Sequence, residues 1–353
     1  MIDNGKAAII IDGQYGSSGK GLLAGYVGWQ EKIDIVTTNF APNSGHTCIL
    51  PHDKIVVHQL PMAGVINKET GIYLNAGSII NPLRLFEEMK KYAVERERVT
   101  VHPRAAVITA ADIVHEESIT SRMRSIGSTR QGVGSALACK ILRQAALAGD
   151  VFPSSMCKVL DLNEMMDGGA RILVEVPQGI DLGINTGLSY PYCTSRDITV
   201  SQAIADAGIH PSYLGKVAMV VRTYPIRVGN VLDDDGTVLG WSGPCYPDQD
   251  EIKWGDVGVE AETTTTTGRP RRVFSWSKTQ YQKSLKVLRP DIVFLNFVNY
   301  LGSWNEYCDF VAGMGGRGPD MVGVGPRPQD VFNTDEGGIA MMRKHMRREG
   351  LWT

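Results

Sequence analysis

Hydrophobic residues along this chain form two kinds of pattern, continuous apolar runs and amphipathic stretches. The continuous apolar run at 7–11 predicts a strand that is buried on both faces of a parallel sheet, and the segments 33–38 and 172–176 are expected to form further strands. Two β-branched runs, at 216–224 and 291–298, predict further strands. Because helix-like stretches lie between these runs, the pattern predicts an α/β sheet with flanking helices and with ligand-binding loops at the strand ends.

The clearest helix start is Asn81-Pro82, which an amphipathic stretch follows. Asparagine caps the first turn of a helix well, and proline fits the first helical position because no hydrogen bond is lost there. The other expected elements are helices at 22–29, 111–124 and 135–148, a strand at 99–107 interrupted at His102-Pro103, and hairpins and loops over 231–267.

Composition narrows the class of protein. The 353 residues are 43% hydrophobic and 21% charged with a net charge of −2, so no global field would attract nucleic acid or an acidic membrane. The six cysteines include no C-x-x-C pair, which excludes the usual zinc and disulfide patterns. No apolar run approaches the roughly 20 residues of a membrane span, and the first residues lack a signal-peptide pattern. We expect one cytoplasmic domain over 1–353, without nucleic-acid or membrane partners.

A glycine-dense turn, Gly13 to Gly21, follows the first predicted strand and reads G-Q-Y-G-S-S-G-K-G. Glycines let backbone N–H groups approach a ligand closely, and a helix start together with Lys20 would supply positive charge for a phosphate. The turn is not a Walker A loop, because the glycine spacing and the residue after the lysine both differ. A plain turn between strand and helix, with an incidental lysine, is the alternative.

The loop after the second strand, 39–47, is rich in hydrogen-bonding side chains and contains His46. Because the ends of neighbouring parallel strands meet, His46 could face the turn at 13–21. As an imidazolium it would stabilise charge on a transferring phosphoryl group. The alternative is a histidine that only forms hydrogen bonds within its loop.

A basic stretch, Thr263 to Arg272, reads T-T-T-T-T-G-R-P-R-R. Arginine side chains of this density can bind carboxylates in bidentate fashion, which favours a small dicarboxylate as partner. A solvated basic loop is the alternative, and the absence of aromatic platforms argues against nucleic acid. A second glycine-rich turn, Gly127 to Gly134, with Arg143 after it, is either another phosphate cradle or an ordinary tight turn. No G-x-G-x-x-G follows the first strand, which argues against a Rossmann dehydrogenase.

These pieces together resemble the adenylosuccinate synthetase family. The resemblance runs through G-S-S-G-K-G, N-S-G-H-T, I-G-S-T-R-Q-G-V-G, V-P-Q-G, Y-P-Y-C-T-S, R-V-G and T-T-G-R-P-R-R, in that order. It implies a large, mainly parallel sheet, a homodimer, Mg²⁺ and a ligase that works in two steps. The 6-oxo group of a purine mononucleotide is first phosphorylated, and the amine of L-aspartate then displaces the phosphate.

The resemblance also implies site residues. At the chemistry it places Ser17, Lys20, His46 and Gln178, and as Mg²⁺ ligands Ser17 and the Gly45 carbonyl. Around the phosphoryl donor it places Gly16, Ser17, Ser18, Gly19, Lys20, Gly21, Gly45, His46, Thr47, Arg271, Asn296, Phe297, Val298, Gly323, Val324, Gly325 and Pro326. Around the purine nucleotide it places Ser17, Asn43, Ser128, Thr129, Gln178, Thr194, Val228, Arg269 and, from the partner subunit, Arg143. Around aspartate it places Thr265, Thr266, Thr267, Gly268, Arg269 and Arg271.

Two departures from the family pattern point to particular substrates. The family has aspartate and glutamate where this chain has Ser17 and Ser18, and the smaller, neutral Ser17 leaves room for a 2-amino group on the purine. This resembles the phage-type branch of the family, which uses dGMP to make the precursor of 2-aminoadenine DNA, in the host cytoplasm. In the family, a carboxylate accepts hydrogen bonds from the guanine base of the donor GTP. The corresponding Asn296-Phe297-Val298 has no carboxylate, and this departure favours ATP or dATP as the donor. The alternatives are an ordinary synthetase acting on IMP and a silent nucleotide-binding regulator.

Overall fold

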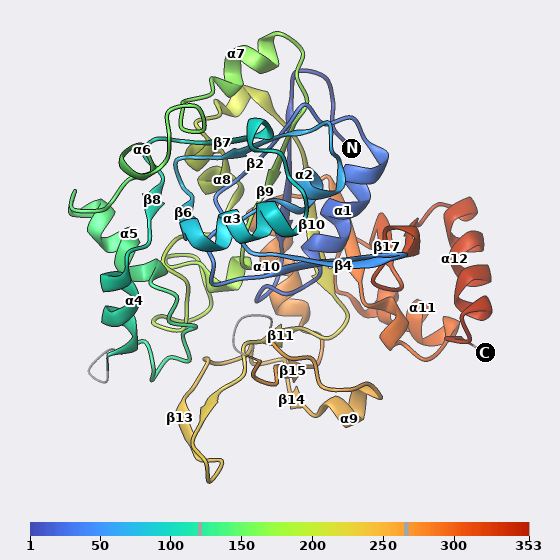
Figure 1. Cartoon of the computed structure of the whole chain (residues 1–353). Coiled ribbons are helices and arrows are strands. Elements are labelled where there is room, and N and C mark those ends of the chain that lie inside the picture. Colours follow the sequence, from blue (N-terminus) through green and yellow to red (C-terminus); the bar gives the residue numbers. More distant parts are fainter. Residues whose placement is uncertain (119–121, 265–267, 353) are drawn as a thin grey trace.

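A mainly parallel sheet runs through the molecule (Figure 1). The structure is a computed structural model that describes residues 1–118, 122–264 and 268–352. Within those residues the sheet has nine strands, and neighbouring strands are parallel except for the pair at one edge. From edge to edge the strands are β18 (Val331–Asn333), β17 (Met321–Gly323), β16 (Ile292–Asn296), β10 (Leu214–Arg222), β1 (Ala7–Asp12), β9 (Ile172–Glu175), β2 (Ile35–Thr38), β5 (Gly71–Leu74) and β7 (Val99–Val101). The predicted α/β sheet is therefore confirmed.

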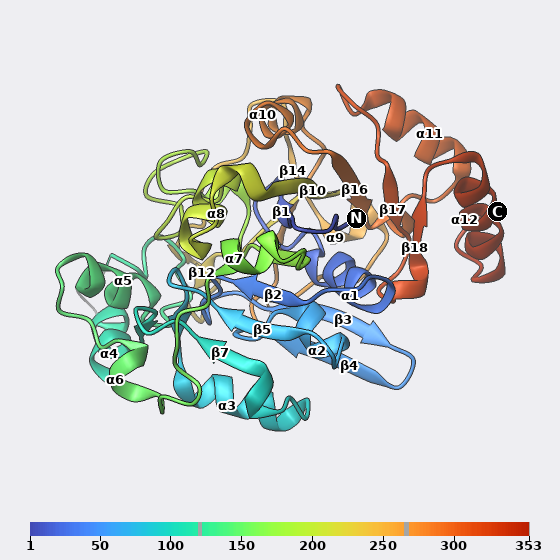
Figure 2. The ribbon, with the colours of Figure 1, turned by 90° about the horizontal axis from the view of Figure 1, so that it is seen from above.

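The central strand, β1, is buried along its whole length because helices cover both faces of the sheet (Figure 2). Ala8 and Ile10 pack into one hydrophobic cluster, and Ile9 and Ile11 pack into a second on the opposite face. The first cluster receives α1 (Lys20–Gln30), α2 (Met62–Ile66) and α3 (Pro82–Lys91). The second receives α7 (Leu162–Asp167), α8 (Val200–Ala207), α10 (Lys278–Leu288), α11 (Trp304–Gly313) and α12 (Glu336–Arg348).

Helix starts agree with the sequence better than helix ends do. The Asn81 side chain accepts a hydrogen bond from the Arg84 N–H at 3.1 Å, so the predicted cap of α3 is confirmed. Helix α4 (Ala110–Glu117) and helix α5 (Val133–Ile141) both end earlier than predicted. The chain turns back after α5 because Arg143 takes a left-handed conformation with φ of 64°.

The predicted strand at 99–107 is two strands, β7 and β8 (Ala106–Val107), which belong to different sheets. Short strands and helices fill the remaining segments. These are β3 (His46–Leu50) with β4 (Asp53–Val57), β6 (Ile79–Ile80) with β8, β12 (Val231–Leu232) with β13 (Val238–Gly240), β11 (Ile226–Arg227), β14 (Glu251–Ile252) and β15 (Arg272–Phe274) in one small sheet, and the helices α6 (Ala148–Val151) and α9 (Trp254–Val257). The hairpins expected over 231–267 are thus present in the described part of that segment.

Strand ends bring the functional segments together. Strands β1, β2, β9, β10 and β16 run in the same direction, and their registers align their carboxyl ends at one edge. In parallel α/β sheets ligands bind at this edge, where the strand order changes direction. No helix in the described residues is long and apolar enough to cross a membrane.

Candidate functional site

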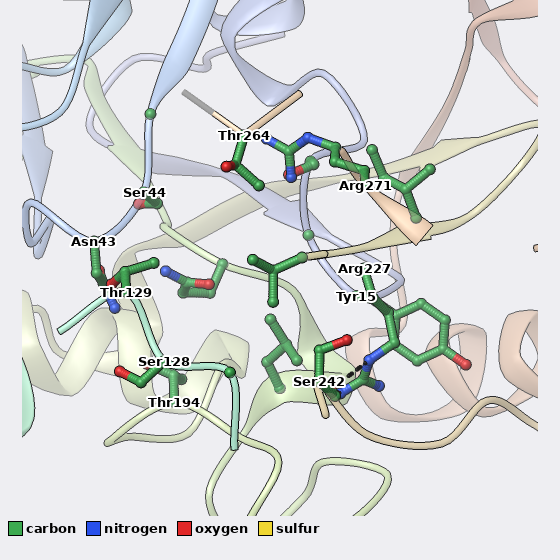
Figure 3. Close-up of a pocket in the computed structure, with 18 of the residues that line it drawn as sticks. Tyr15, Asn43, Ser44, Ser128, Thr129, Thr194, Arg227, Ser242, Thr264 and Arg271 are labelled. Atoms are coloured by element: carbon green, nitrogen blue, oxygen red, sulfur yellow. Dashed lines mark hydrogen bonds between the residues drawn. The ribbon is translucent and has the colours of Figure 1, made fainter. Parts of the chain in front are cut away.

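A cavity of about 1090 Å³ opens at the carboxyl edge of the sheet (Figure 3). Its walls come from the loops that follow β1, β2, β9 and β16 and from the segments at 126–134, 190–195 and 260–264. The predicted residues on its wall are Gly16, Ser17, Gly19, Lys20, Gly21, Asn43, Gly45, His46, Thr47, Ser128, Thr129, Gln178, Thr194, Val228, Arg271, Asn296, Phe297, Gly325 and Pro326. Segments far apart in sequence therefore share one cavity.

A buried carboxylate, which the sequence analysis missed, organises the turn at 13–19. Asp12 ends β1, and its Oδ1 accepts hydrogen bonds from the Gln14 and Gly16 N–H groups at 2.9 and 3.2 Å. Its Oδ2 accepts from the Ser18 N–H and from Lys20 Nζ, both at 3.2 Å. These donors were expected to face a phosphate, but in the free protein they are satisfied by Asp12. An acidic residue at the end of an apolar strand was the available signal.

Lys20 lies between this loop and the turn after β9. Its Nζ donates to the Gln178 carbonyl at 2.6 Å, and its side chain is 6% exposed. Burial lowers the pKa of Lys20, while the carboxylates of Asp12 and Glu175 act in the opposite direction. The turn after β9 packs so closely on the glycine turn that position 179 must be a glycine, because a Cβ on Gly179 would lie 2.1 Å from the Gly16 nitrogen. The two turns therefore form one rigid wall around the ammonium group.

The two serines of the loop have different surroundings. Ser17 has a left-handed backbone with φ of 57°, and its hydroxyl oxygen accepts a hydrogen bond from Arg271 Nη1 at 2.8 Å. Ser18 is fully buried, and its hydroxyl contacts the Gln14 side chain at 3.3 Å. Only Ser17 borders the cavity, so the prediction that Ser18 lines the donor site is wrong for its side chain.

His46 begins β3 and is buried with its ring stacked on Phe40, at 4.2 Å between ring centroids. Its Nε2 has no hydrogen-bond partner among the described residues. Burial lowers the pKa of His46 well below 6.5, and the nearby Lys20 and His58 lower it further. The free protein therefore holds a neutral imidazole. The imidazolium that the sequence analysis expected requires added negative charge, such as that of a phosphate.

The buried, neutral His46 predicts a measurable pH dependence of stability. An unfolded histidine binds a proton near pH 6.5, whereas the folded one resists it, so protonation favours unfolding as the pH falls below about 6.5. We expect the melting temperature of the ligand-free protein to fall between pH 8 and pH 5, and the fall to be a few degrees smaller in His46→Gln. Equal losses in both proteins would contradict the assignment.

The wall opposite the glycine turn holds Asn43, Ser128, Thr129 and Thr194, whose side chains group together in Figure 3. Sequence reasoning missed Arg227 as a site residue; it borders the cavity and holds the neighbouring segments at 192 and 242–244. Its guanidinium donates to the carbonyls of Ser242, Pro244 and Tyr192 at 2.5 to 3.2 Å. Burial lowers the pKa of Arg227 to about 10.

The second glycine turn does not offer its helix start to a phosphate. The carboxylate of Glu116 accepts hydrogen bonds from the N–H groups of Gly132, Gly134 and Ser135 at 2.7 to 3.2 Å. Of the two alternatives for this turn, these hydrogen bonds favour the ordinary tight turn, because Glu116 occupies the N–H groups that a phosphate cradle would use. Arg143 is exposed at the far end of α5 and does not border this cavity.

The arginine loop folds back on itself as a narrow hairpin. The Arg271 N–H donates to the Glu262 carbonyl at 2.8 Å, and the Thr264 N–H donates to the Arg269 carbonyl at 2.9 Å. Arg269 Nη2 donates to the carbonyl of Gly127, a wall residue of the second glycine turn, at 3.2 Å, although Arg269 itself does not border the cavity. Gly268 likewise lies off the wall. The predicted aspartate contacts Thr265, Thr266 and Thr267 lie outside the described residues.

Only some of the residues predicted to bind the base of the phosphoryl donor border the cavity. Asn296, Phe297, Gly325 and Pro326 border it, but Asn296 Nδ2 donates to the Ser18 carbonyl at 3.1 Å and so supports the glycine turn. Three predicted residues lie behind the wall, because they belong to the core or the sheet: Val298, Gly323 and Val324. Two wall residues that the sequence analysis missed are Asn299 and Tyr300.

Comparisons with known proteins give the family. The model of the adenylosuccinate synthetase family matches residues 9–160 and 155–306. The chain is 39% identical over 325 residues to the N6-succino-2-amino-2'-deoxyadenylate synthase of Salmonella phage PMBT28, which covers 85% of this chain and 87% of that protein. Among solved structures, the succinoaminodeoxyadenylate synthetase of cyanophage S-2L, bound to dGMP and to dATP as an energy donor, matches with a TM-score of 0.85 and 35% identity. That match covers 96% of this chain and 99% of the cyanophage chain.

The fully ligated adenylosuccinate synthetase of Plasmodium falciparum shares the fold at a TM-score of 0.76 and 17% identity, over 93% of this chain and 99% of that chain. The order of the motifs, the cavity at the strand ends and the family match over most of the chain agree. This chain belongs to the adenylosuccinate synthetase family, whose members are ligases that form a C–N bond.

Proposed function

We propose that this protein joins L-aspartate to C6 of dGMP, with ATP or dATP as phosphoryl donor. The products are 2-amino-2'-deoxy-N6-succinyladenylate, phosphate and ADP or dADP. The observation that carries the proposal is Ser17, a small neutral residue on the cavity wall where the family has an aspartate. The phage relatives named above support this substrate. In a phage, the reaction would take place in the host cytoplasm.

Ser17 suits a purine with a 2-amino group for two physical reasons. A serine is shorter than an aspartate, which leaves space beside purine C2. Its hydroxyl oxygen already accepts one hydrogen bond, from Arg271, and retains a second lone pair for an N–H donor of the guanine edge. A serine hydroxyl is too weakly acidic to act as a base near neutral pH, so Ser17 positions the purine and does not remove the N1 proton.

The remaining wall residues fit the two chemical steps. Lys20 supplies an ammonium group for the donor's phosphates, and His46 supplies an imidazole whose unpartnered Nε2 can hydrogen-bond a transferring phosphoryl group. Gln178 offers a side-chain amide beside the purine. Phosphorylation of the 6-oxygen creates a good leaving group. The aspartate amine then forms the C6–N bond as the C6–O bond breaks and phosphate leaves.

Magnesium fits this site as an ion that the donor brings with it. The described residues contain no cluster of three or more His, Cys, Asp or Glu side chains that could hold a metal. Mg²⁺ usually keeps several waters and binds through substrate phosphates with few protein ligands. The Gly45 carbonyl is the oxygen on the cavity wall that would hold it, because Arg271 and the purine take both lone pairs of the other expected ligand, the Ser17 hydroxyl. Bound there, the ion would neutralise charge on the phosphates.

The position of Arg143 supports a site that two subunits share. Arg143 is exposed and follows Leu142, whose side chain is 63% exposed, and Ile141, which is 69% exposed and borders the mouth of this chain's own cavity. Arg143 therefore lies next to the cavity mouth without entering it. We infer that this end of α5 packs against a second copy of the chain and that Arg143 reaches the purine nucleotide's phosphate in the partner's cavity.

Subunit mixing tests this inference. Arg143→Ala and Lys20→Met are each expected to abolish turnover as homodimers. In a co-expressed mixture, the hybrid dimer holds one site with both native residues, so about a quarter of wild-type activity should return, since half the dimers are hybrids with one working site of two. A mixture as inactive as its components would contradict a shared site.

The proposed reaction is tested by its requirement for all three substrates. Phosphate release should need dGMP, L-aspartate and ATP together, and mass spectrometry should detect the succinyl adduct of 2-aminodeoxyadenylate. A protein that binds dGMP and ATP but releases no phosphate on addition of aspartate would instead be a silent regulator. That outcome would refute the proposed ligase activity.

A further inference from the structure

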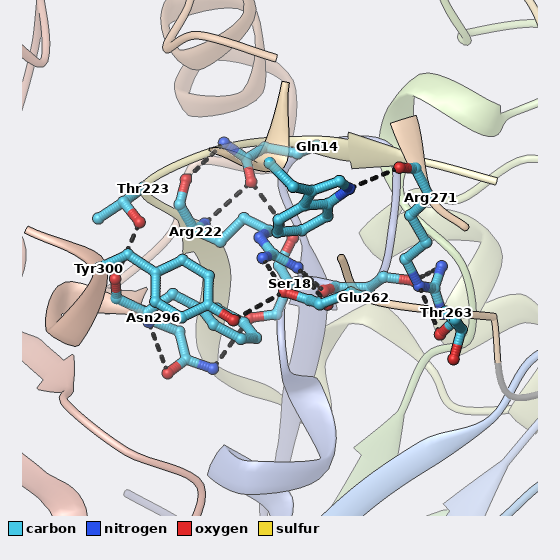
Figure 4. Close-up of polar contacts among 12 residues, drawn as sticks. Gln14, Ser18, Arg222, Thr223, Glu262, Thr263, Arg271, Asn296 and Tyr300 are labelled. Atoms are coloured by element: carbon cyan, nitrogen blue, oxygen red, sulfur yellow. Dashed lines mark hydrogen bonds and ion pairs between the residues drawn. The ribbon is translucent and has the colours of Figure 1, made fainter. Parts of the chain in front are cut away.

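An ion pair joins the buried Arg222 to the half-buried Glu262 beside the cavity (Figure 4). Arg222 ends β10 and is completely buried. Its Nη2 and Nη1 both donate to the carboxylate of Glu262, the latter at 3.2 Å. Glu262 borders the cavity, at the base of the arginine hairpin. A forked guanidinium–carboxylate pair fixes both distance and orientation between the segments that carry it.

This pair contacts residues assigned to the purine and to the donor. Arg222 Nη1 also donates to the carbonyl of Ser17, the residue proposed to meet the purine, at 3.0 Å. The guanidinium carbon lies 3.8 Å from the centre of the Phe297 ring, on the expected donor side. The Tyr300 hydroxyl donates to Glu262 Oε1 at 3.0 Å. The pair is therefore shared by the purine loop and the donor wall.

The residue that carries this carboxylate also lies at the base of the aspartate hairpin, through its backbone. The Glu262 carbonyl accepts from the Arg271 N–H at 2.8 Å, and Arg271 in turn holds the Ser17 hydroxyl. Burial of Glu262 opposes its ionisation, but Arg222 and then Arg271 hold the pKa of Glu262 below its ordinary value. Glu262 is therefore an anion near neutral pH, and the ion pair is present under working conditions.

We propose that Glu262 and Arg222 are positioning residues that couple donor binding to aspartate binding. Neither is a catalytic residue. A donor base that packs against Phe297 and Tyr300 orders the groups that hold Glu262, and Glu262 fixes the hairpin on which the aspartate-binding arginines lie. The inference rests on the proposed function only for the identity of the substrates, because the contacts themselves do not depend on which purine is bound.

The test is the effect of a donor analogue on the dissociation constant of aspartate. L-Aspartate is titrated calorimetrically into protein saturated with dGMP, with and without the β,γ-imido analogue of ATP, which cannot transfer its phosphoryl group. In the wild-type protein the analogue should tighten aspartate binding about fivefold or more, a usual size for coupling between sites. In Glu262→Gln the ratio should fall to about one, and in Tyr300→Phe it should fall partway, since the ring remains.

The matched control is Glu251→Gln. Glu251 also forms a forked pair with an arginine, Arg272. This pair joins β14 to β15 in the small three-stranded sheet, and neither residue borders the cavity. In Glu251→Gln the donor analogue should tighten aspartate binding by the same factor as in the wild-type protein. Because Glu262→Gln leaves the buried Arg222 without its carboxylate, melting temperatures are compared as well. The double variant Arg222→Met, Glu262→Gln should recover the melting temperature without recovering the coupling.

Three results would overturn the inference: a wild-type ratio of one, an undiminished ratio in Glu262→Gln, or a double variant that recovers coupling together with stability. A different result would refute dGMP as the substrate without refuting the positioning role of Glu262. If dGMP does not bind and protein saturated with IMP loses coupling in Glu262→Gln, the proposed purine is wrong and the positioning role is supported.

Discussion

Replacing Lys20 by methionine is expected to lower kcat by about a thousandfold, the loss typical of a group that stabilises transition-state charge in a site shielded from water. The ammonium lies in a wall of two tightly packed turns and has contacts with Asp12 Oδ2 at 3.2 Å and the Gln178 carbonyl at 2.6 Å. Methionine fills a similar volume and removes the charge. No other described lysine lies in this loop, so the lost charge has no substitute there.

Steady-state kinetics with saturating donor would measure this effect, and the matched control is Lys6→Met. Lys6 precedes β1 at its opposite end, and its Nζ also donates to a carbonyl, that of Ser212, at 2.7 Å. The control should retain kcat. A Lys20→Met protein that keeps its melting temperature and loses less than tenfold in kcat would show that Lys20 is a structural partner of Asp12 and not a phosphate ligand.

Replacing Ser17 by aspartate is expected to shift the preference from dGMP toward IMP by about a hundredfold or more in the ratio of kcat/KM values. The longer side chain takes the space beside purine C2, and its carboxylate provides the general base that serine lacks. The backbone at this position is left-handed, with φ of 57°, a conformation that aspartate tolerates well. The variant should therefore fold as the wild type does.

Ser17→Ala separates size from hydrogen bonding. Alanine keeps the space for a 2-amino group but loses the hydroxyl that Arg271 contacts at 2.8 Å. If size decides the choice of purine, Ser17→Ala should still prefer dGMP while its KM rises. An unchanged preference in Ser17→Asp would refute the role of this residue in substrate choice.

The fold could be read from the sequence because its central strands are mostly apolar or β-branched and are covered on both faces of the sheet. The runs that were read as strands at 7–11, 33–38, 172–176, 216–224 and 291–298 each contain a strand, although charged residues such as Asp34 and Glu175 lie within two of them. Helix ends were less accurate. The apolar residues after Ile141 continue a helical pattern, but Ile141 and Leu142 are exposed, and a left-handed residue at 143 ends the segment.

The site could be predicted as a set of loops but not in its internal contacts. A glycine turn looks the same in sequence whether a phosphate or a side chain fills it. Here the carboxylates of Asp12 and Glu116 fill the two turns in the free protein. Tertiary pairs such as that of Arg222 and Glu262, which join residues 40 positions apart, leave no local pattern. Residues behind the wall, such as Val298, were included because a motif does not reveal which side chains face the core.

If Ser17 makes this cavity select a 2-aminopurine nucleotide, dGMP should outcompete IMP. In the competition, equal concentrations of dGMP and IMP are offered together with ATP, Mg²⁺ and L-aspartate, and both succinyl products are quantified by mass spectrometry. We expect the product from dGMP to predominate by about a hundredfold or more. A predominance of adenylosuccinate would contradict this expectation and identify the protein as a synthetase acting on IMP.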